Sequence, residues 1–113
     1  MYRIAGESDL ALLLAAPIAV LYKHSPICPT SSLAHDEMIV LSGRCQVPVF
    51  LLDVVRHRPL SRAVAERIGV AHASPQVIIL RDGAGIWHRS HFEIEAGAVA
   101  RALDDVIGGA AVR

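Results

Sequence analysis

The stretch KHSPICPTSS, residues 23–32, decides how the chain is expected to fold, because it places a cysteine directly before a proline. It directly follows the apolar run Ile18–Tyr22, which has the composition of a fully buried strand. Proline is favoured in the first turn of a helix, where its missing N–H would have had no partner. The sequence therefore predicts a strand, a short loop and a helix that begins at Pro29, with Cys28 at or near its N-cap.

A thiol at the N-terminus of a helix is expected to ionise readily. The unpaired backbone N–H groups and the positive end of the helix dipole favour the thiolate over the thiol. Lys23 and His24 precede Cys28 closely and can add positive charge. Reactive cysteines have such surroundings, so we expect the pKa of Cys28 to lie below the ordinary thiol value of about 8.5. The alternative is a cysteine that merely fills an apolar gap, which would need neither a flanking proline nor a helix terminus.

The rest of the chain predicts strands that alternate with helices. Ser8 and Asp9 are expected to cap the first helix, which Pro17 ends. Further helices are expected over Pro29–Ser42, Pro59–Ile68 and Glu93–Ile107. Buried strands are expected over Ile18–Tyr22, Pro48–Val55 and Gln76–Leu80, followed by the turn Arg81–Gly85 and an antiparallel return strand over Ile86–Ser90. This order predicts a single α/β domain over residues 1–113 with a mostly parallel sheet.

The composition narrows the class of function. The 113 residues are 53% hydrophobic and 19% charged, which is typical of a globular chain large enough to bury a core. Eleven basic residues balance eleven acidic ones, so neither a nucleic acid nor an anionic membrane is expected as the main partner. The apolar run Leu10–Val20 follows Glu7 and Asp9 instead of basic residues, and we interpret it as helical and not as a signal peptide. A soluble protein of the cytoplasm is therefore expected.

The elements around Cys28 resemble those of a known fold family. Cys28–Ser31 (CPTS) is similar to the active-site motif of thioredoxin-fold oxidoreductases, Cys-x-x-Cys or Cys-x-x-Ser at a strand-to-helix junction. Arg58–Ser90 is similar to the thioredoxin segment that runs from the third helix through a cis-proline to the strand hairpin, with Pro75 in the place of that proline. The resemblance implies a thioredoxin-like fold, in which about four helices flank a central mixed β-sheet, mostly parallel with a C-terminal antiparallel hairpin.

A narrower resemblance concerns the activity. KHSPICPTSS together with SPQVIILRDG resembles the monothiol bacilliredoxin family, thioredoxin-like proteins with a Cys-Pro-x-Ser motif that act on bacillithiol mixed disulfides. The resemblance implies a thiol-disulfide oxidoreductase that removes bacillithiol, or a similar low-molecular-weight thiol, from protein mixed disulfides. That thiol would be the co-substrate, and client proteins carrying mixed disulfides would be the partners. A monomer is expected, with no tightly bound cofactor and no metal.

The resemblance also implies a role for each residue near the thiol. Cys28 is expected to be the nucleophile, and Ser31 stands where a dithiol enzyme keeps its resolving cysteine. A hydroxyl cannot resolve a mixed disulfide, but it can hydrogen-bond to a thiolate. Ser31 is therefore expected to stabilise the thiolate, together with Lys23, His24 and Pro29.

The substrate is expected at the edge of the sheet that carries Cys28. Ser74 and Pro75 are implied to pair with the incoming chain or cofactor in an extended, strand-like manner. Arg56 and Arg58 follow the C-terminal end of a strand, the edge at which open α/β sheets bind ligands, and they can receive the anionic malate of bacillithiol. The alternative interpretation of these two arginines is a solvated loop.

Two other classes of function remain open for a monothiol protein of this fold. One is a carrier that holds an iron–sulfur cluster between two protomers, although Pro29-Thr30 stands where such carriers usually have Gly-Phe. The other is a non-catalytic adaptor that uses the fold only for binding. An adaptor has no reason to lower the pKa of Cys28, so the reactivity of this thiol separates the adaptor from an enzyme.

The second thiol, Cys45, is expected to lie too far from Cys28 to form a disulfide with it. The helix predicted over Pro29–Ser42 would separate its two ends by roughly 20 Å at about 1.5 Å per residue. A disulfide needs Cα atoms within about 7 Å of each other. Cys45 is therefore predicted to be a packed structural cysteine or a thiol that oxidises independently.

Overall fold

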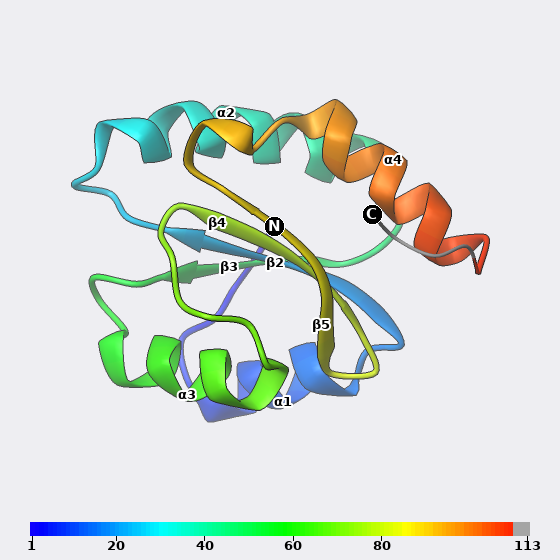
Figure 1. The fold of residues 1–113 in the computed structure, drawn as a ribbon. Coiled ribbons are helices and arrows are strands. Elements are labelled where there is room, and N and C mark those ends of the chain that lie inside the picture. The colour runs from blue at the N-terminus through cyan, green and yellow to red at the C-terminus, as the bar shows by residue number, and fades with distance from the viewer. Residues whose placement is uncertain (110–113) are drawn as a thin grey trace.

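A computed structural model describes residues 1–109, so the last four residues of the predicted domain lie outside the description. Within residues 1–109 the chain forms a five-stranded sheet and four α-helices (Figure 1). The strands are β1 (Tyr2–Arg3), β2 (Ile18–His24), β3 (Val49–Asp53), β4 (Gln76–Arg81) and β5 (Ala84–Ser90). The helices are α1 (Glu7–Ala15), α2 (Pro29–Arg44), α3 (Arg58–Ile68) and α4 (Ala96–Ile107), and a 3₁₀ turn, η1 (His91–Glu93), precedes α4.

The sheet has the strand order β1-β3-β2-β4-β5. Strands β1 and β2 both run parallel to β3, whereas β4 runs antiparallel to both β2 and β5. The predicted mixed sheet with a C-terminal antiparallel hairpin and four flanking helices is confirmed. Fewer of the strand pairs are parallel than the sequence predicts, because β4 runs antiparallel to β2.

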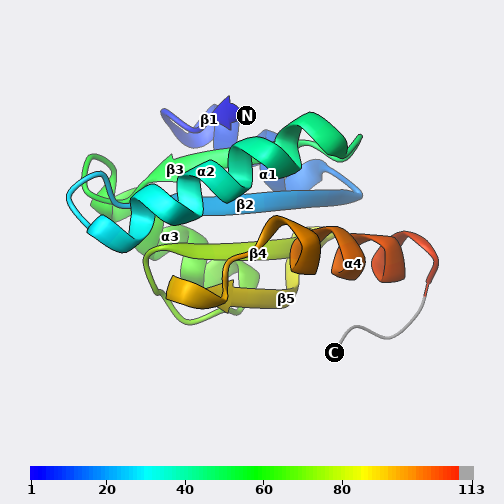
Figure 2. The ribbon, with the colours of Figure 1, turned by 90° about the horizontal axis from the view of Figure 1, so that it is seen from above.

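The helices cover both faces of the sheet. Helices α2 and α4 lie on one face and α1 and α3 on the other (Figure 1), and Figure 2 shows α2 and α4 side by side above the strands. One core, which includes Val20, Met38 and Val99, fills the space under α2 and α4. A second core, which includes Leu13 and Val64, fills the space under α1 and α3. Because strand side chains alternate between the two faces, each central strand contributes to both cores.

Three loops meet at one edge of the sheet, and this convergence positions the candidate site. The parallel strands β2 and β3 end together at this edge, where His24 lies opposite Asp53. Strand β4 begins there, because it runs antiparallel to β2 with Gln76 opposite Lys23. The loop from β2 to α2, the loop from β3 to α3 and the segment before β4 therefore lie at the same edge, which Cys28 shares.

The first helix begins earlier than predicted and is capped differently. Ser8 and Asp9 lie inside the first turn of α1, and Gly6 is its N-cap, without a side-chain hydrogen bond to the helix. The Asp9 carboxylate reaches back and accepts a hydrogen bond from the N–H of Ala5 at 2.8 Å. The prediction of a cap at Ser8 or Asp9 was wrong, since an acidic residue in the first turn can bind a preceding N–H without being the cap itself.

The last predicted helix, Glu93–Ile107, is divided in two. Glu93 closes the 3₁₀ turn, Glu95 has an extended backbone, and α4 begins at Ala96. The N–H of Ala96 donates to the Glu37 carboxylate at 2.9 Å, so a side chain of α2 caps the start of α4. This contact links two segments far apart in the sequence, which explains why the local pattern did not show the break.

The longest described helix, α2, has 16 residues. None of the helices in the described part of the chain is both long and apolar enough to cross a membrane.

Candidate active site

Cys28 occupies the N-cap of α2, as the sequence predicts. Its backbone is extended, with φ −100° and ψ 123°, and Pro29 is the first residue of the helix. The N–H of Cys28 donates to the carbonyl oxygen of Ser25 at 3.1 Å, and the Cys28 carbonyl accepts from the N–H of Ser31 at 3.0 Å. These bonds hold a partly exposed thiol at the start of the helix.

The start of α2 lowers the pKa of the Cys28 thiol below its ordinary value. The largest contribution is a hydrogen bond to the sulfur from the backbone N–H of Ser31, followed by one from the N–H of Thr30. The hydroxyl groups of the same two residues add to this effect, and burial opposes it. The N–H of Ser31 thus serves both the Cys28 carbonyl and the sulfur, and the first turn of a helix leaves N–H groups such as that of Thr30 without a partner inside the helix. The site therefore favours the ionised, nucleophilic form of the cysteine.

Ser31 is buried at the start of α2 and is hydrogen-bonded to two other segments. Its side chain is fully buried, and its Oγ accepts a hydrogen bond from the N–H of Ser25 at 3.2 Å. The hydroxyl of Tyr22 donates to the carbonyl oxygen of Ser31 at 3.2 Å. Ser31 thus connects β2, the loop after it and α2. Its role in stabilising the thiolate of Cys28 stays a prediction.

A tyrosine and two histidines form a cluster between β2 and α2. The hydroxyl of Tyr22 lies 2.8 Å from Nδ1 of His24, and the rings of His24 and His35 are 4.8 Å apart. Burial, and next the negative charge of Cys28, raise the pKa of Tyr22, so its hydroxyl stays protonated. Burial, and next His35, lower the pKa of His24. His24 is therefore neutral near pH 7 and does not supply the positive charge that the sequence predicted for it.

Lys23 points to the other side of the sheet from Tyr22 and His24, because successive side chains of a strand alternate. The Lys23 side chain is 0% exposed, and its Nζ lies 3.2 Å from Nδ1 of His72. Burial lowers the pKa of Lys23 to about 8. Lys23 is absent from the groups that lower the pKa of Cys28. The predicted stabilisation of the thiolate by Lys23 is therefore corrected, since its ammonium group belongs to the α3 side of the sheet.

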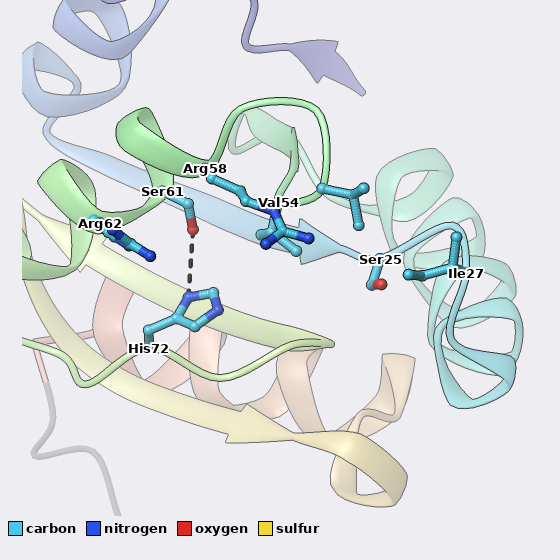
Figure 3. A pocket seen from close by; sticks show the side chains of 8 residues that line it. Ser25, Ile27, Val54, Arg58, Ser61, Arg62 and His72 are labelled. Atoms are coloured by element: carbon cyan, nitrogen blue, oxygen red, sulfur yellow. Dashed lines mark hydrogen bonds between the residues drawn. The ribbon is translucent and has the colours of Figure 1, made fainter.

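A pocket of about 310 Å³ lies between the Cys28 loop and α3 (Figure 3). Its polar lining consists of Ser25, Arg58, Ser61, Arg62 and His72. Its apolar lining consists of Ile27, Val54 and Val55. The dashed line in Figure 3 joins Oγ of Ser61 to Nδ1 of His72, which are 3.3 Å apart. We call this the cationic pocket, for its two arginines and for Lys23, which is hydrogen-bonded to His72 in its lining.

The two arginines predicted to bind substrate are separated in the structure. Arg58, the first residue of α3, lines the cationic pocket. Arg56 lies in a different hollow, with Gly6 and Glu7. The Asp53 carboxylate accepts a hydrogen bond from the N–H of Arg56 at 2.9 Å and turns the chain at this point. The prediction that both arginines serve one site is therefore corrected for Arg56.

The Ser74–Pro75 peptide bond is cis. The carbonyl of Pro75 accepts a hydrogen bond from the N–H of His91 at 3.0 Å. The hydroxyl oxygen of Ser74 is buried and has no hydrogen-bond partner among the described residues. Since Gln76 pairs with Lys23, this bond lies at the edge of the sheet where β2 leads to Cys28. The role of Ser74 and Pro75 in substrate binding stays a prediction.

Cys45 is the C-cap of α2, at the opposite end of the helix from Cys28. A helix of 16 residues is about 24 Å long, more than three times the Cα separation of about 7 Å that a disulfide permits. Both cysteines are free thiols. The sulfur of Cys45 donates a hydrogen bond to the carbonyl of Val47 at 3.3 Å, and burial raises its pKa. This thiol is therefore less reactive than Cys28 and out of its reach.

Sequence reasoning missed part of the cationic pocket. Arg58, Ser61 and Arg62 are spaced by three and four residues, which places them on one face of a helix. That spacing was a usable signal for a polar helix face. His72 follows the helix in a loop, and no local pattern indicates that it contacts Lys23, 49 residues earlier in the chain.

The rate at which Cys28 is alkylated should rise with pH through a midpoint below the ordinary thiol value of about 8.5. The direction follows from the hydrogen bonds that the first turn of α2 gives to the thiolate. The measurement is the rate of iodoacetamide labelling from about pH 4 to about pH 10 in the Cys45→Ser variant, where Cys28 is the remaining thiol. A midpoint at or above the ordinary value would contradict an activated cysteine.

Ser31→Ala should keep most of the activity and raise the pKa of Cys28, because the variant loses the hydroxyl but keeps the backbone N–H that contributes most. We expect a loss of activity of roughly threefold to tenfold, the size of the net contribution of one typical hydrogen bond, because the Ser31 hydroxyl contributes least among the groups that lower this pKa. Ser31→Cys is the matched comparison, and it should form a disulfide with Cys28 and shift the chemistry towards dithiol exchange. Complete inactivity of Ser31→Ala would mean that the hydroxyl takes part in the reaction itself.

Cys45→Ser should turn over at the rate of the unsubstituted protein. The reason is the length of α2, which keeps the sulfur of Cys45 away from every step at Cys28. Activity and intact mass are measured together after mild oxidation of the unsubstituted protein. A monomer that has lost two hydrogens, with a Cys28–Cys45 disulfide after digestion, would overturn this account of Cys45.

Solved structures define the class of protein to which this fold and thiol belong. A thioredoxin-fold protein to which an oxidoreductase activity is ascribed is 25% identical, with a TM-score of 0.81 over 88% of this chain and 90% of that one. A mutant thioredoxin from Halobacterium salinarum is 16% identical, with a TM-score of 0.72 over 99% of this chain and 91% of that one. Thioredoxin from Malassezia sympodialis is 12% identical, with a TM-score of 0.76 over 93% and 89%. The protein has a thioredoxin fold, with a thiol at the N-cap of α2.

A family model makes the assignment narrower. The model of monothiol bacilliredoxin BrxC matches residues 7–99, a range that contains Cys28 and the Ser74–Pro75 bond. The chain belongs to this family. Fold and family together make it a thiol-disulfide oxidoreductase of the thioredoxin-fold class.

Proposed function

We propose that the protein removes bacillithiol from protein mixed disulfides and that Cys28 is the one thiol it uses. The observation that carries this proposal is the position of Cys28 at the N-cap of α2, where the N–H groups of Ser31 and Thr30 lower its pKa. Membership of the bacilliredoxin family supports the class of substrate. The cationic pocket, next to the loop that carries Cys28, supports a substrate with an anionic part.

The first step exchanges one disulfide for another. The Cys28 thiolate attacks the bacillithiol sulfur of the client's mixed disulfide, and a bond between Cys28 and bacillithiol forms as the bond to the client's cysteine breaks. The client's sulfur leaves as a thiolate and takes a proton from solvent. One disulfide and one thiolate stand on each side of this step, so it needs no outside oxidant or reductant.

The second step returns Cys28 to its thiolate. A thiolate of another low-molecular-weight thiol or protein attacks the bacillithiol sulfur of the adduct, forms a disulfide with it and releases Cys28. Ser31 cannot take this part, because a hydroxyl forms no disulfide, and Cys45 lies at the far end of α2. The cycle therefore depends on an external thiol, which a reducing compartment such as the cytoplasm supplies.

A client protein that carries one bacillithiol mixed disulfide tests the proposal. With bacillithiol as the external thiol, catalytic amounts of the protein should release the client much faster than bacillithiol does alone. The same client with glutathione in place of bacillithiol shows which thiol is preferred. A release rate that the protein leaves unchanged for both forms would contradict the proposal.

The same preparation distinguishes the two alternatives. Colour after anaerobic incubation with iron and sulfide, without release of the client, would support a cluster carrier. Absence of both colour and release, with a Cys28 pKa at the ordinary value, would support an adaptor that only binds.

A further inference from the structure

We propose that the cationic pocket binds the carboxylates of the low-molecular-weight thiol and so selects anionic thiols over neutral ones. This inference rests on the proposed function, because it describes how the same site recognises its small-molecule partner. The recognising groups are the guanidinium groups of Arg58 and Arg62 and the Lys23–His72–Ser61 chain of hydrogen bonds. The chemical class of ligand is a thiol whose non-reacting end carries one or more carboxylates.

The pocket gathers positive charge without an acidic partner. Arg58 and Arg62 stand one turn apart on α3, and Figure 3 shows both side chains in the lining with His72. The ion pair between Arg67 and Glu7 lies elsewhere on the surface, and within residues 1–109 neither pocket arginine has a carboxylate within 4.0 Å. The positive charges at the pocket therefore have no carboxylate of the described chain to neutralise them. Carboxylates bind guanidinium groups with two parallel hydrogen bonds, which makes a carboxylate the natural complement.

Lys23 adds a buried charge behind the same lining. Its side chain is fully buried in β2, and among the described residues His72 is its single hydrogen-bond partner. An ammonium group has three N–H donors, and burying it without a counter-charge is costly. A methionine would fill the space without this cost. A lysine at this position is therefore explained by an anion that binds close by, which supplies the missing counter-charge when the pocket is filled.

A hydrogen bond from Lys23 to His72 connects the buried ammonium group with the lining of the pocket. An ammonium group can only donate, so Nδ1 of His72 accepts from Lys23, and a neutral ring then carries its proton on Nε2. Burial, and next Lys23 and Arg62, lower the pKa of His72, so the ring is neutral near pH 7. The hydroxyl of Ser61 lies 3.3 Å from the same Nδ1 and fixes the ring from α3. His72 is thus held as a hydrogen-bond donor through Nε2 next to two arginines.

The position of the pocket suits a small thiol whose sulfur is to meet Cys28. Ser25 and Ile27 line the pocket and also belong to the turn that the Cys28 N–H closes by donating to Ser25 at 3.1 Å. The pocket and the nucleophile therefore share one loop, and in the proposed complex a ligand with its carboxylates between Arg58 and Arg62 extends along this loop towards Cys28. Ile27 and Val54 form an apolar wall, which limits solvent and strengthens the attraction between the ligand and the arginines.

The test compares one client protein bearing three different mixed disulfides: with bacillithiol, with glutathione and with uncharged 2-mercaptoethanol. The unsubstituted protein should release the two carboxylate-bearing thiols with the higher kcat/KM. In the Arg58→Gln/Arg62→Gln variant, kcat/KM should fall about 10- to 100-fold for these two and less than about threefold for 2-mercaptoethanol. The loss should be in KM, because these residues hold the non-reacting end of the ligand. The ratio of kcat/KM for the bacillithiol and glutathione mixed disulfides shows which of the two carboxylate-bearing thiols the pocket fits better.

Two further variants distinguish a loss of ligand binding from a folding defect. Lys23→Met removes the buried charge without a cavity and should show the same selective loss with a stable fold. Arg67→Gln is the matched control on α3, outside the pocket, and it should leave all three rates unchanged. Equal losses on the charged and uncharged substrates, or no loss on any of them, would overturn the inference.

A binding measurement gives an answer that does not depend on activity. L-Malate alone, titrated into the unsubstituted protein, should shift the amide NMR signals of Arg58, Ser61, Arg62 and His72, and the Arg58→Gln/Arg62→Gln variant should not respond. If malate binds but no mixed disulfide is cleaved, the proposed function fails and the anion pocket stands. If mixed disulfides are cleaved but malate does not bind, the anion pocket fails and the proposed function stands.

Discussion

Cys28→Ser should lose catalytic removal of bacillithiol completely, with a fall of at least about a thousandfold to the uncatalysed rate. A serine hydroxyl at the N-cap of α2 is still a good cap, so the helix should form as before. The hydroxyl is not ionised near neutral pH and forms no disulfide, so neither step of the exchange can start. Release of bacillithiol from the labelled client, followed by mass spectrometry, measures the loss.

Cys45→Ser is the control for this substitution, because it removes the other thiol of the chain in the same chemical way. It should keep the full rate, since Cys45 lies at the far end of α2. Residual turnover by Cys28→Ser above the uncatalysed rate would show that another group of the protein carries the reaction.

Lys23→Met should stabilise the protein while it impairs recognition of the anionic thiol. Folding lowers the pKa of Lys23 from an ordinary 10.5 to about 8, through burial. Since one pKa unit corresponds to about 1.4 kcal/mol, removing the charge should raise the free energy of unfolding by up to about 3 kcal/mol at pH 7. Replacement of a buried charge by an apolar side chain of similar size has this direction in other proteins.

The gain should depend on pH in a defined way. Below about pH 8 the folded protein carries the buried charge at its full cost. Between about pH 8 and 10.5 the folded state releases this proton while the unfolded chain keeps it, so this group makes the unsubstituted protein more stable as the pH rises. The advantage of Lys23→Met should therefore be largest at pH 7 and fall to about 1 kcal/mol by pH 10. The pKa of His72, the partner of Lys23, lies below this window, so His72 does not titrate within it.

Urea unfolding at about pH 7 and about pH 10 measures this difference for the unsubstituted protein and Lys23→Met. Arg101→Met, at an exposed position of α4, is the control and should change stability by less than about 0.5 kcal/mol at both pH values. A Lys23→Met protein that is less stable at neutral pH, or equally favoured at both pH values, would show that Lys23 is not a costly buried charge.

Local sequence patterns were sufficient for the elements that carry Cys28. The Cys28-Pro29 pair predicted the first helical residue correctly, because the missing N–H of proline is tolerated only at a helix start. The turn around Asp82 and Gly83 predicted the hairpin of β4 and β5 in the same way. Strand β1 was missed, since its two exposed residues have no pattern of their own and are fixed by pairing with β3.

The environment of Lys23 could be predicted only in part. A strand that is buried on both faces is a continuous apolar run, so its sequence does not show which side chains point to which face. The sequence therefore placed Lys23 beside Cys28, whereas in the structure it lies on the opposite face from Tyr22. Counting by two from Tyr22 would have separated them. The contact between Lys23 and His72 joins β2 to a loop 49 residues later, and only the folded chain shows it. The half of the site formed by one helix start was thus accessible from sequence, and the half formed by long-range contacts was not.

Intact mass of the protein after a single turnover tests the central claim most directly. The reduced protein is mixed with an equal amount of the bacillithiol-labelled client in the absence of any other thiol, and the reaction is quenched in acid. The intact mass of each protein is measured first, and digestion then locates the adduct. The account predicts that the mass of one bacillithiol moves from the client to Cys28, while Cys45 stays a free thiol. A bacillithiol adduct on Cys45, a Cys28–Cys45 disulfide, or a client that keeps its label would contradict it.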